Sequence, residues 1–461
     1  MMQLALASDD EEKEKVPHIL FVTPYYPPEI TPPAMRIHEM ALRLVRLGHQ
    51  VTVLTTFPNF PSGVVPLAYR GHRQLREQKD GITIVRVWSY ISPNRGFLRR
   101  ILAQLSFGCV APFLGGSAVG QPDVIIVESP PLFNAIAGRL LASWKRCPFI
   151  FTVADLWPEV AVKMGMLRNR LLIRLAEWLE WTTYQRAALV WVVTEGLRAI
   201  LLQRGLAASH IFVVTNGVDC TTFCPSVKAL ARAELAWDNR FTVLYAGSHG
   251  PSHGLGAIID TAERLHACKD IRIILVGDGA EKEALMADAQ RRGLSNITFL
   301  DPQPYERIPL LLAASDACLA TASKAILFQG VLPVKMYEAM ACARPIILAV
   351  DGEACRVAIQ EAGAAIYAEP ENPAAIADAI LYLHEHPFEA EVLGQRGRAF
   401  VEQHFDRNQL VKKLHQQIMT VLHRNDTTPY HEWLADSAPF QLPETEPLSS
   451  ACGSRDRGSA I

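Results

Sequence analysis

Short apolar runs alternate with helical patterns along the first half of the chain. Residues 34–47, for example, place apolar side chains at helical spacing and end at Gly48. The predicted strands of this half are residues 18–23, 51–55, 82–87, 124–127, 149–153, 189–193 and 211–214. Repeated strand–helix–strand order is typical of a parallel, doubly wound sheet. We therefore expect a first Rossmann-like domain over residues 17–216.

The same pattern pauses in a polar stretch, residues 217–240, and then begins again. The second set of predicted strands is residues 241–246, 271–276, 297–300, 317–320 and 346–349. This restart predicts a linker over 217–240, a second Rossmann-like domain over 241–405, and a C-terminal helix over 406–424. The remaining segments, 1–16 and 425–461, are rich in charge or in proline and serine, so we expect disordered tails.

The predicted fold class is therefore α/β, with two Rossmann-like, doubly wound parallel sheets that face each other. Doubly wound sheets bind ligands at the carboxyl ends of their strands. Two such sheets in one chain are suited to hold a ligand in the cleft between them. The loops that follow the predicted strands are consequently where the chemistry is expected.

Composition narrows the functional class. The chain has 461 residues and a net charge of −2, so it lacks the basic field that a nucleic-acid partner requires. Its nine cysteines include no Cys-x-x-Cys pair, which predicts reduced thiols in a cytoplasmic protein and no zinc site. The first residues lack the basic leader and apolar core of a secretory signal.

An uncharged segment, residues 101–120, follows the basic residues Arg95, Arg99 and Arg100. Three interpretations stay open for it: a buried helix, a helix lying on a membrane surface, and a spanning helix. Its four glycines and its proline weigh against a span.

The first candidate binding loop follows the strand that begins the second domain. It contains Gly247, Ser248, His249, Gly250 and His253, just before a predicted helix. Glycines let the backbone approach a ligand, and a helix N-terminus offers free N–H groups to a diphosphate. An ordinary strand–helix turn is the alternative.

Two more loops of this domain are candidates for the same cleft. Gly277 and Asp278 follow the next strand, and Leu300 ends the strand after it, where a flat base could lie against the backbone. Either loop could also be a simple turn.

The strongest candidate lies at the start of the predicted helix 334–342. Pro333 suits a helix start, Lys335 falls in the first turn, and Glu338 lies one turn further on the same face. A lysine in the first turn opposes the helix dipole unless an anion is bound nearby. Lysine for phosphate and glutamate for ribose hydroxyls suit a nucleotide diphosphate. A surface Lys–Glu pair is the alternative.

In the first domain, Asp155, Trp157 and Glu159 follow the buried strand 149–153. Two carboxylates and an indole at this position can orient sugar hydroxyls and provide a stacking surface. Core packing of Trp157 and a helix-terminal role for Glu159 are the alternatives. Proline-rich loops after the first two strands supply further candidates for an acceptor wall: Tyr26, Pro27, Glu29 and Asn59.

Taken in order along residues 17–423, these motifs resemble glycosyltransferase family 4, whose fold is GT-B. The matching segments are PYYPPE, RLGHQVTVLT, FPNFPSG, ESPPL, ADLWPE, TNGVD, YAGSHG, VGDG and PVKMYEAMACARPII. The nearest branch is similar to fucosamine-transferase-like enzymes that extend bacterial surface polysaccharide and O-antigen units. The resemblance implies a UDP-sugar donor as co-substrate, transfer with retention, and an active site without a metal ion or other cofactor.

The chain departs from the family pattern at several positions. The Glu-x7-Glu motif has Gly330 in place of its first glutamate, although its second, Glu338, is present. Ala154 replaces the histidine that often precedes Asp155, and Ser248 or His249 with His253 replaces a paired arginine and lysine. We expect Lys335 to supply the missing phosphate cation, and Asp155 or Glu159 to orient the acceptor or take its proton.

The predicted function is transfer of a sugar from a nucleotide sugar, in the hexosyl or N-acetylhexosaminyl class, to a glycan or lipid-linked acceptor. The acceptor is expected at the cytoplasmic face of the membrane, which segment 95–120 would contact peripherally. Two alternatives remain: a UDP-sugar isomerase of the two-domain epimerase type, and a non-catalytic homologue that binds sugar nucleotides.

Overall fold

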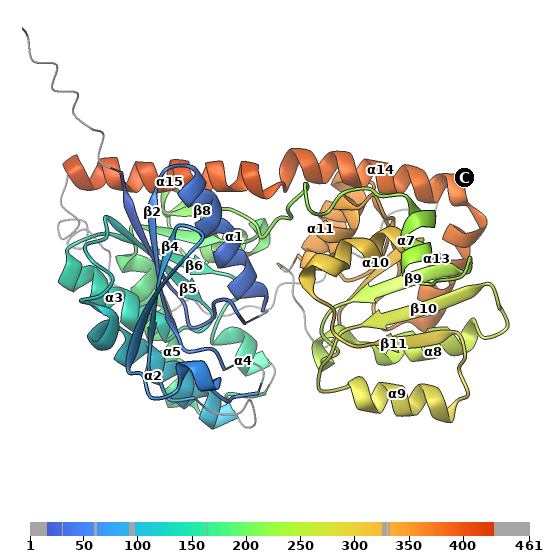
Figure 1. The fold of residues 1–461 in the computed structure, drawn as a ribbon, viewed down its shortest axis with the longest axis horizontal. Coiled ribbons are helices and arrows are strands. Elements are labelled where there is room, and N and C mark those ends of the chain that lie inside the picture. Colours follow the sequence, from blue (N-terminus) through green and yellow to red (C-terminus); the bar gives the residue numbers. More distant parts are fainter. Residues whose placement is uncertain are drawn as a thin grey trace, which may run out of the picture. The chain divides into compact units, whose positions relative to one another are not determined.

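The computed structural model describes residues 16–427, except Ile30 and residues 60–61, 92–96, 164, 325–329 and 331 (Figure 1). Residues 1–15 of the predicted tail 1–16, the basic residue Arg95 and the segment 428–461 lie outside the described residues. The chain divides into two compact units, one built mainly from Met1–Thr152 and the other mainly from Val190–Gln416. It contains two β-sheets, which are treated separately below.

The first sheet has eight strands in the order β3-β4-β2-β1-β5-β6-β7-β8. Strand β1 pairs in parallel with both β2 and β5, whereas β3 pairs antiparallel with β4. The strands are β1 His18–Val22, β2 Gln50–Thr56, β3 Gln74–Lys79, β4 Ile82–Val87, β5 Val124–Ser129, β6 Phe149–Val153, β7 Leu189–Val192 and β8 Ile211–Val213. All seven predicted strands are confirmed, and β3 was missed because its sequence, QLREQK, contains only one apolar residue.

Helices connect the strands of this sheet. They are α1 Pro32–Arg46, α2 Phe97–Gly115, α3 Asn134–Lys145, α4 Glu159–Lys163, α5 Arg170–Arg186 and α6 Glu195–Gln203. Helix α1 begins where the Thr31 side chain accepts a hydrogen bond from the N–H of Ala34, with prolines in its first turn. It ends before Gly48, whose φ of +94° an L side chain rarely adopts, so the predicted helix end at this glycine is confirmed.

The second sheet has six parallel strands in the order β11-β10-β9-β12-β13-β14. They are β9 Phe241–Ala246, β10 Ile271–Val276, β11 Ile297–Leu300, β12 Ala317–Thr321, β13 Ile346–Ala349 and β14 Ala365–Tyr367. The strand order reverses direction between β9 and β12. Such a reversal is the point at which open α/β sheets bind ligands, at the carboxyl ends of the strands.

Alternate side chains of each central strand face opposite sides of the second sheet. Leu244 and Ile274 belong to a core that includes residues of α10 and α11, whereas Val243 and Ile273 belong to a core shared with α8 and α13. The helices are α7 Lys228–Glu234, α8 Gly256–Arg264, α9 Lys282–Arg291, α10 Ile308–Ala314, α11 Val334–Ala341, α12 Glu353–Cys355, α13 Pro373–Glu385, α14 Pro387–His404 and α15 Arg407–Thr427. Both faces are covered by helices, so the predicted doubly wound α/β fold is confirmed.

Three predicted segments differ in detail from the structure. The linker 217–240 contains a short helix, α7. The C-terminal helix α15 continues to Thr427, so the first residues of the predicted tail are helical. Within the described part of the chain, no helix is long and apolar enough to cross a membrane, which removes the spanning interpretation of segment 101–120. Most of that segment forms helix α2, which is interrupted by neither Gly108 nor Pro112.

Candidate functional site

Three predicted loops lie side by side at the carboxyl edge of the second sheet. The Gly247 N–H donates to the carbonyl of Val276 at 2.9 Å, and the Gly277 N–H donates to the carbonyl of Leu300 at 3.2 Å. These bonds join the ends of β9, β10 and β11. The structure therefore brings together three of the loops that the sequence assigns to the donor.

His249 links the first two loops through its backbone. Its N–H donates to the Asp278 carbonyl at 2.8 Å, and its own carbonyl accepts from the Glu281 N–H at 2.9 Å. A side chain on Gly279 would lie only 2.5 Å from the His249 carbonyl carbon, so this close approach requires glycine.

The His249 ring lies in the interior rather than at the surface. It has no exposed area and is flanked by the rings of Tyr245 and Phe299, at centroid distances of 6.0 and 6.3 Å. The sequence assigns this ring to phosphate binding. In the structure the residue instead shapes the loop, because a ring without exposed surface cannot contact a ligand in this arrangement.

The rest of the glycine loop is tied to the sheet by hydrogen bonds. The Tyr245 hydroxyl donates to the carbonyl of Ser248 at 2.7 Å, and the Thr321 hydroxyl donates to the carbonyl of His253 at 2.7 Å. After Gly250 the chain makes a 3-10 turn, Pro251–His253, before α8 begins at Gly256. The 3-10 turn therefore lies between the glycine loop and the N-terminus of α8.

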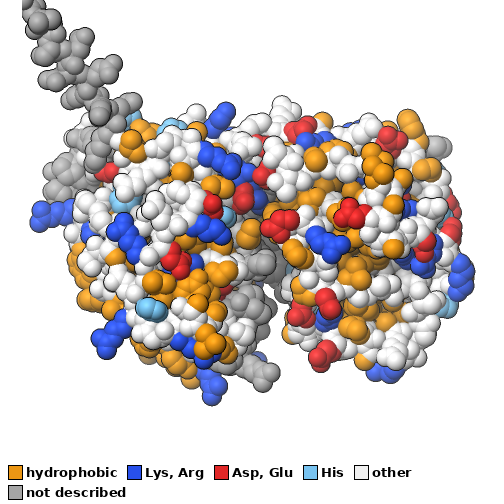
Figure 2. Space-filling view, viewed as in Figure 1, with side chains coloured by type: hydrophobic (Ala, Val, Ile, Leu, Met, Phe, Trp, Pro, Cys, Tyr) orange, Lys and Arg blue, Asp and Glu red, His pale blue; other side chains and the backbone are white. Residues whose placement is uncertain are grey.

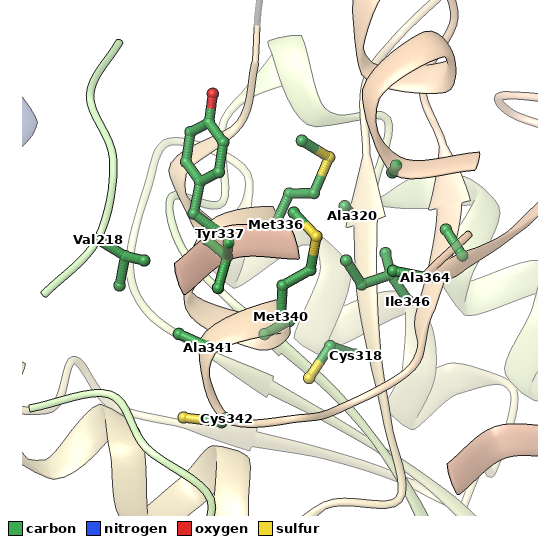
Figure 3. Close-up of a cluster of buried hydrophobic side chains, with 14 of the residues drawn as sticks. Val218, Cys318, Ala320, Met336, Tyr337, Met340, Ala341, Cys342, Ile346 and Ala364 are labelled. Carbon is green, nitrogen blue, oxygen red and sulfur yellow. The ribbon is translucent and has the colours of Figure 1, made fainter. Parts of the chain in front are cut away.

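Helix α11 is anchored by its apolar face. Figure 3 shows Met336 and Met340 pointing from the helix toward Ala320 of β12 and Ile346 of β13, within a fully buried cluster. Pro333 occupies the N-cap position. The buried methionines fix the rotation of the helix, so Lys335 in its first turn has a defined direction.

The Lys335 ammonium group lies over the face of the Tyr245 ring, with Nζ 3.7 Å from the ring centroid. It is also next to Gly247, where an added Cβ would lie 2.9 Å from Nζ. The nitrogen is buried and has no hydrogen-bond partner among the described residues. Burial lowers the pKa of Lys335 to about 7, although the nearby Glu338 opposes this shift.

Glu338 is also buried, with 9% of its surface exposed. Burial raises the pKa of this carboxyl, while Arg407 and Lys335 act in the opposite direction. The alternative of a surface Lys–Glu pair is therefore wrong: both charged ends are inside the protein. Buried charges need partners, and an anionic ligand with hydroxyl groups would supply them.

Three residues of this site were missed from the sequence. Tyr245 supplies the ring under Lys335, Arg407 lies near Glu338, and Lys282 pairs with Asp301 at 2.8 Å beside the end of β11. Tyr245 could have been found, because it lies two residues before Gly247 at the end of a predicted strand. Arg407 is 69 positions after Glu338 (407 − 338), and nothing in local spacing connects them.

The proposed acceptor loops of the first sheet are tied together by buried side chains. The Glu29 carboxylate accepts a hydrogen bond from the N–H of Asn59 at 2.7 Å, and Arg86 donates to the Pro27 carbonyl at 2.6 Å. Tyr26 is 1% exposed, and its hydroxyl lies 3.1 Å from Nδ1 of His38. The sequence assigns Tyr26 and Glu29 to the acceptor wall, but in the structure these buried side chains support the loops from inside.

The carboxylates that follow β6 have different surroundings. Glu159 begins α4 and forms ion pairs with Lys163, at 2.7 Å, and with Arg204. Burial opposes ionisation here, but these two partners hold the pKa of Glu159 below its usual range. Asp155 and Trp157 are half-buried in the preceding turn. Glu159 is therefore a weak proton acceptor, because two cations already neutralise it.

Within the described residues, no three histidine, cysteine or acidic side chains are grouped so that they could hold a metal ion. The cationic side chains described at the second-sheet site are Lys335, Lys282 and Arg407. Glycine-rich turns at the carboxyl edge of a doubly wound sheet are where such folds bind nucleotides.

Family comparisons agree with this class. A glycosyl transferase 4-like domain matches residues 33–217, and the glycosyl transferases group 1 domain matches residues 227–400. Together these cover every strand of the two sheets except β1, which precedes the first match. The chain belongs to the glycosyltransferases of family 4, with the GT-B fold.

Individual relatives carry related descriptions. A colanic acid biosynthesis glycosyl transferase of Escherichia coli K12 is 27% identical over 387 residues, which is 80% of this chain and 94% of that protein. A D-inositol 3-phosphate glycosyltransferase of Segniliparus rotundus is 34% identical over 161 residues, about a third of each chain.

Solved structures share the fold at low sequence identity. Sucrose-phosphate synthase from Thermosynechococcus elongatus has a TM-score of 0.70 at 17% identity, covering 88% of this chain and 100% of that one. Anabaena HepE in complex with UDP-glucose has a TM-score of 0.64 at 18% identity, covering 87% and 99%. These likenesses bear on the fold alone.

Proposed function

We propose that this glycosyltransferase moves a sugar, with retention, from a UDP-sugar to a lipid-linked or glycan acceptor in surface-polysaccharide biosynthesis. The observation that carries the proposal is the buried Lys335 ammonium group, which lies beside Gly247 and has no anionic partner within hydrogen-bond reach among the described residues. The donor class is supported by the family and by a fold neighbour that binds UDP-glucose. The pathway is supported by the colanic acid relative.

In this proposal the protein itself meets the charge that develops on the departing phosphate. Lys335 and the backbone N–H groups of Ser248 and Gly250 stabilise the leaving diphosphate without a metal ion, whereas the N–H groups of Gly247 and His249 hold the loop itself. Glu338 accepts hydrogen bonds from the ribose hydroxyls. Asp155 or Glu159 orients the acceptor hydroxyl or takes its proton.

A donor screen tests this function. The purified protein is incubated with a set of UDP-sugars, with and without lipid-linked acceptors, and with and without a chelator, while UDP release is measured by mass spectrometry. We expect one donor to release UDP only when the acceptor is present. The chelator should not reduce the rate of this release. Conversion of a UDP-sugar without acceptor would instead identify an isomerase, and binding without turnover would identify a non-catalytic homologue.

We also propose that helix α2 contacts the cytoplasmic face of a membrane. Four of its exposed or partly exposed apolar residues follow one stripe at helical spacing: Leu98, Leu102, Leu105 and Phe113. The Phe113 ring packs against the exposed Trp144 ring, with 5.0 Å between the ring centroids. Residues 81–122 contain no acidic side chain, so the exposed Arg99 and Arg100 give this surface a positive charge.

A shallow apolar depression of about 370 Å³ lies on the same helix, lined by Tyr90, Leu102, Leu105, Ser106 and Cys109. Figure 2 shows hydrophobic side chains gathered on one part of the first unit. An apolar stripe with basic residues at its start suits an interface with anionic lipids.

Replacing Phe113 with glutamate tests the membrane contact. We expect wild-type protein to sediment with anionic liposomes at low salt and the F113E variant to lose most of this binding, because a carboxylate would enter the lipid interface. Leu230→Glu is the matched control, since Leu230 is equally exposed on α7 of the other unit, at 68% for each. Equal sedimentation of both variants and wild type would contradict the proposal.

A further inference from the structure

The Lys335 ammonium group is a cation with little negative charge around it. Lys335 faces the ring of Tyr245, which belongs to β9, and it faces His253, which belongs to the turn Pro251–His253. His249 of the glycine loop is a third neighbour, and that histidine also faces Lys282 of α9. These neighbours are neutral or positive.

Two carboxylates lie on the elements around this cluster. Glu338 faces Lys335 from the next turn of α11, but Arg407 faces the same carboxylate. Asp278 faces His249 from the loop after β10. Among the described residues, the Lys335 nitrogen forms no hydrogen bond and no ion pair within 4.0 Å. Neither carboxylate therefore contacts it directly.

An isolated buried ammonium group is costly, and such groups neutralise in preference to remaining charged without a partner. The two histidines reinforce this effect. Burial lowers the pKa of His253 to about 4, with Lys335 acting in the same direction, and burial also lowers the pKa of His249. Protonation of either ring would place a second cation beside the lysine.

We propose that Lys335 gives up its proton in the empty site and regains it when a nucleotide diphosphate binds, so that donor binding takes up one proton. This inference rests on the proposed donor site and adds a linkage between donor affinity and pH. The diphosphate brings negative charge to the buried nitrogen, and an opposite charge at this distance favours the ammonium form. The lysine therefore becomes a cation only when the substrate is bound.

The direction of the pH dependence follows from this linkage. Burial lowers the pKa of Lys335 to about 7 in the empty site, and bound anion raises it. Above about pH 7 the complex holds one more proton than the free protein, so affinity falls by about tenfold for each unit rise in pH. Below that pH both forms hold the proton, and the affinity levels off.

Titration calorimetry with UDP-glucose measures the proton directly. UDP-glucose is the probe because its diphosphate diester stays fully ionised throughout the pH range used. Binding is measured at about pH 8 in two buffers of different ionisation enthalpy, and the dependence of the observed heat on the buffer gives the protons taken up. We expect uptake close to one proton per UDP-glucose, and a dissociation constant that rises about tenfold between about pH 8 and pH 9.

Two variants assign the proton. Lys335→Arg keeps a permanent cation, since the guanidinium does not deprotonate in this range, so it binds UDP-glucose with no proton uptake. Lys269→Met is the matched control: Lys269 is bonded to the His266 carbonyl before β10, and its loss leaves the uptake unchanged.

Each other result has a definite meaning. If wild type binds without taking up a proton at about pH 8, the inference is overturned while the donor site stands. Uptake that persists in Lys335→Arg, or that occurs only below about pH 6, belongs to the histidines and overturns it as well. A wild-type protein that binds neither UDP nor UDP-glucose contradicts the proposed donor site itself.

Discussion

Lys335→Ala is expected to lower kcat/KM for sugar transfer by about 10²- to 10³-fold, the usual cost of removing one group that stabilises charge in a transition state. The ammonium nitrogen is buried beside Gly247 and lies 3.7 Å from the Tyr245 ring centroid, so no neighbouring cation occupies the same place. Initial rates with the donor found in the screen, measured across substrate concentrations, give the change in kcat and in KM separately.

The fold should survive this substitution. The side chain of Lys335 makes no hydrogen bond with the described residues, and α11 is held by Met336 and Met340 on its other side. We expect a melting temperature within a few degrees of wild type, because the substitution breaks no hydrogen bond of the Lys335 nitrogen. A variant with wild-type kcat/KM would remove Lys335 from the mechanism. Lys269→Ala is the control for loss of a lysine outside the site.

The positions of most strands along the chain, and of the candidate loops that follow them, could be predicted from the sequence because both depend on local patterns. Apolar runs marked all seven predicted strands of the first sheet, and the glycine turns at 247 and 277 fall where β9 and β10 end. Carboxyl ends of parallel strands meet at one edge, so naming the loops also placed them together. The short β3 escaped prediction because pairing with β4, rather than apolar content, holds it in the sheet.

Side-chain roles inside the loops could not be predicted in the same way. Tyr26, Glu29 and His249 have the polar groups of ligand-binding residues, yet all three are buried and used to hold their own loops. Burial depends on contacts between segments far apart in sequence. The same limit hid Arg407, which approaches Glu338 from the start of α15.

Gly277→Ala is expected to disrupt the donor site more than the addition of a methyl group at any other position in its loops. The φ of Gly277 is +141°, and an added Cβ would lie 1.9 Å from the Gly247 carbonyl oxygen, so the loops after β9 and β10 must separate. That separation breaks the alignment of the Gly247 backbone with Lys335. We expect UDP affinity to fall by at least about tenfold and stability by about 1–3 kcal/mol, measured by calorimetry and by urea unfolding.

Gly256→Ala separates this effect from a general response to losing a glycine. Gly256 begins α8, and a Cβ there meets nothing within 4 Å. Alanine is the better helix former, so this variant should bind UDP like wild type and unfold at equal or higher urea concentration. If Gly277→Ala also binds UDP like wild type, the two glycine loops do not form the donor site together. If both variants bind weakly, the loss does not come from contact between the loops.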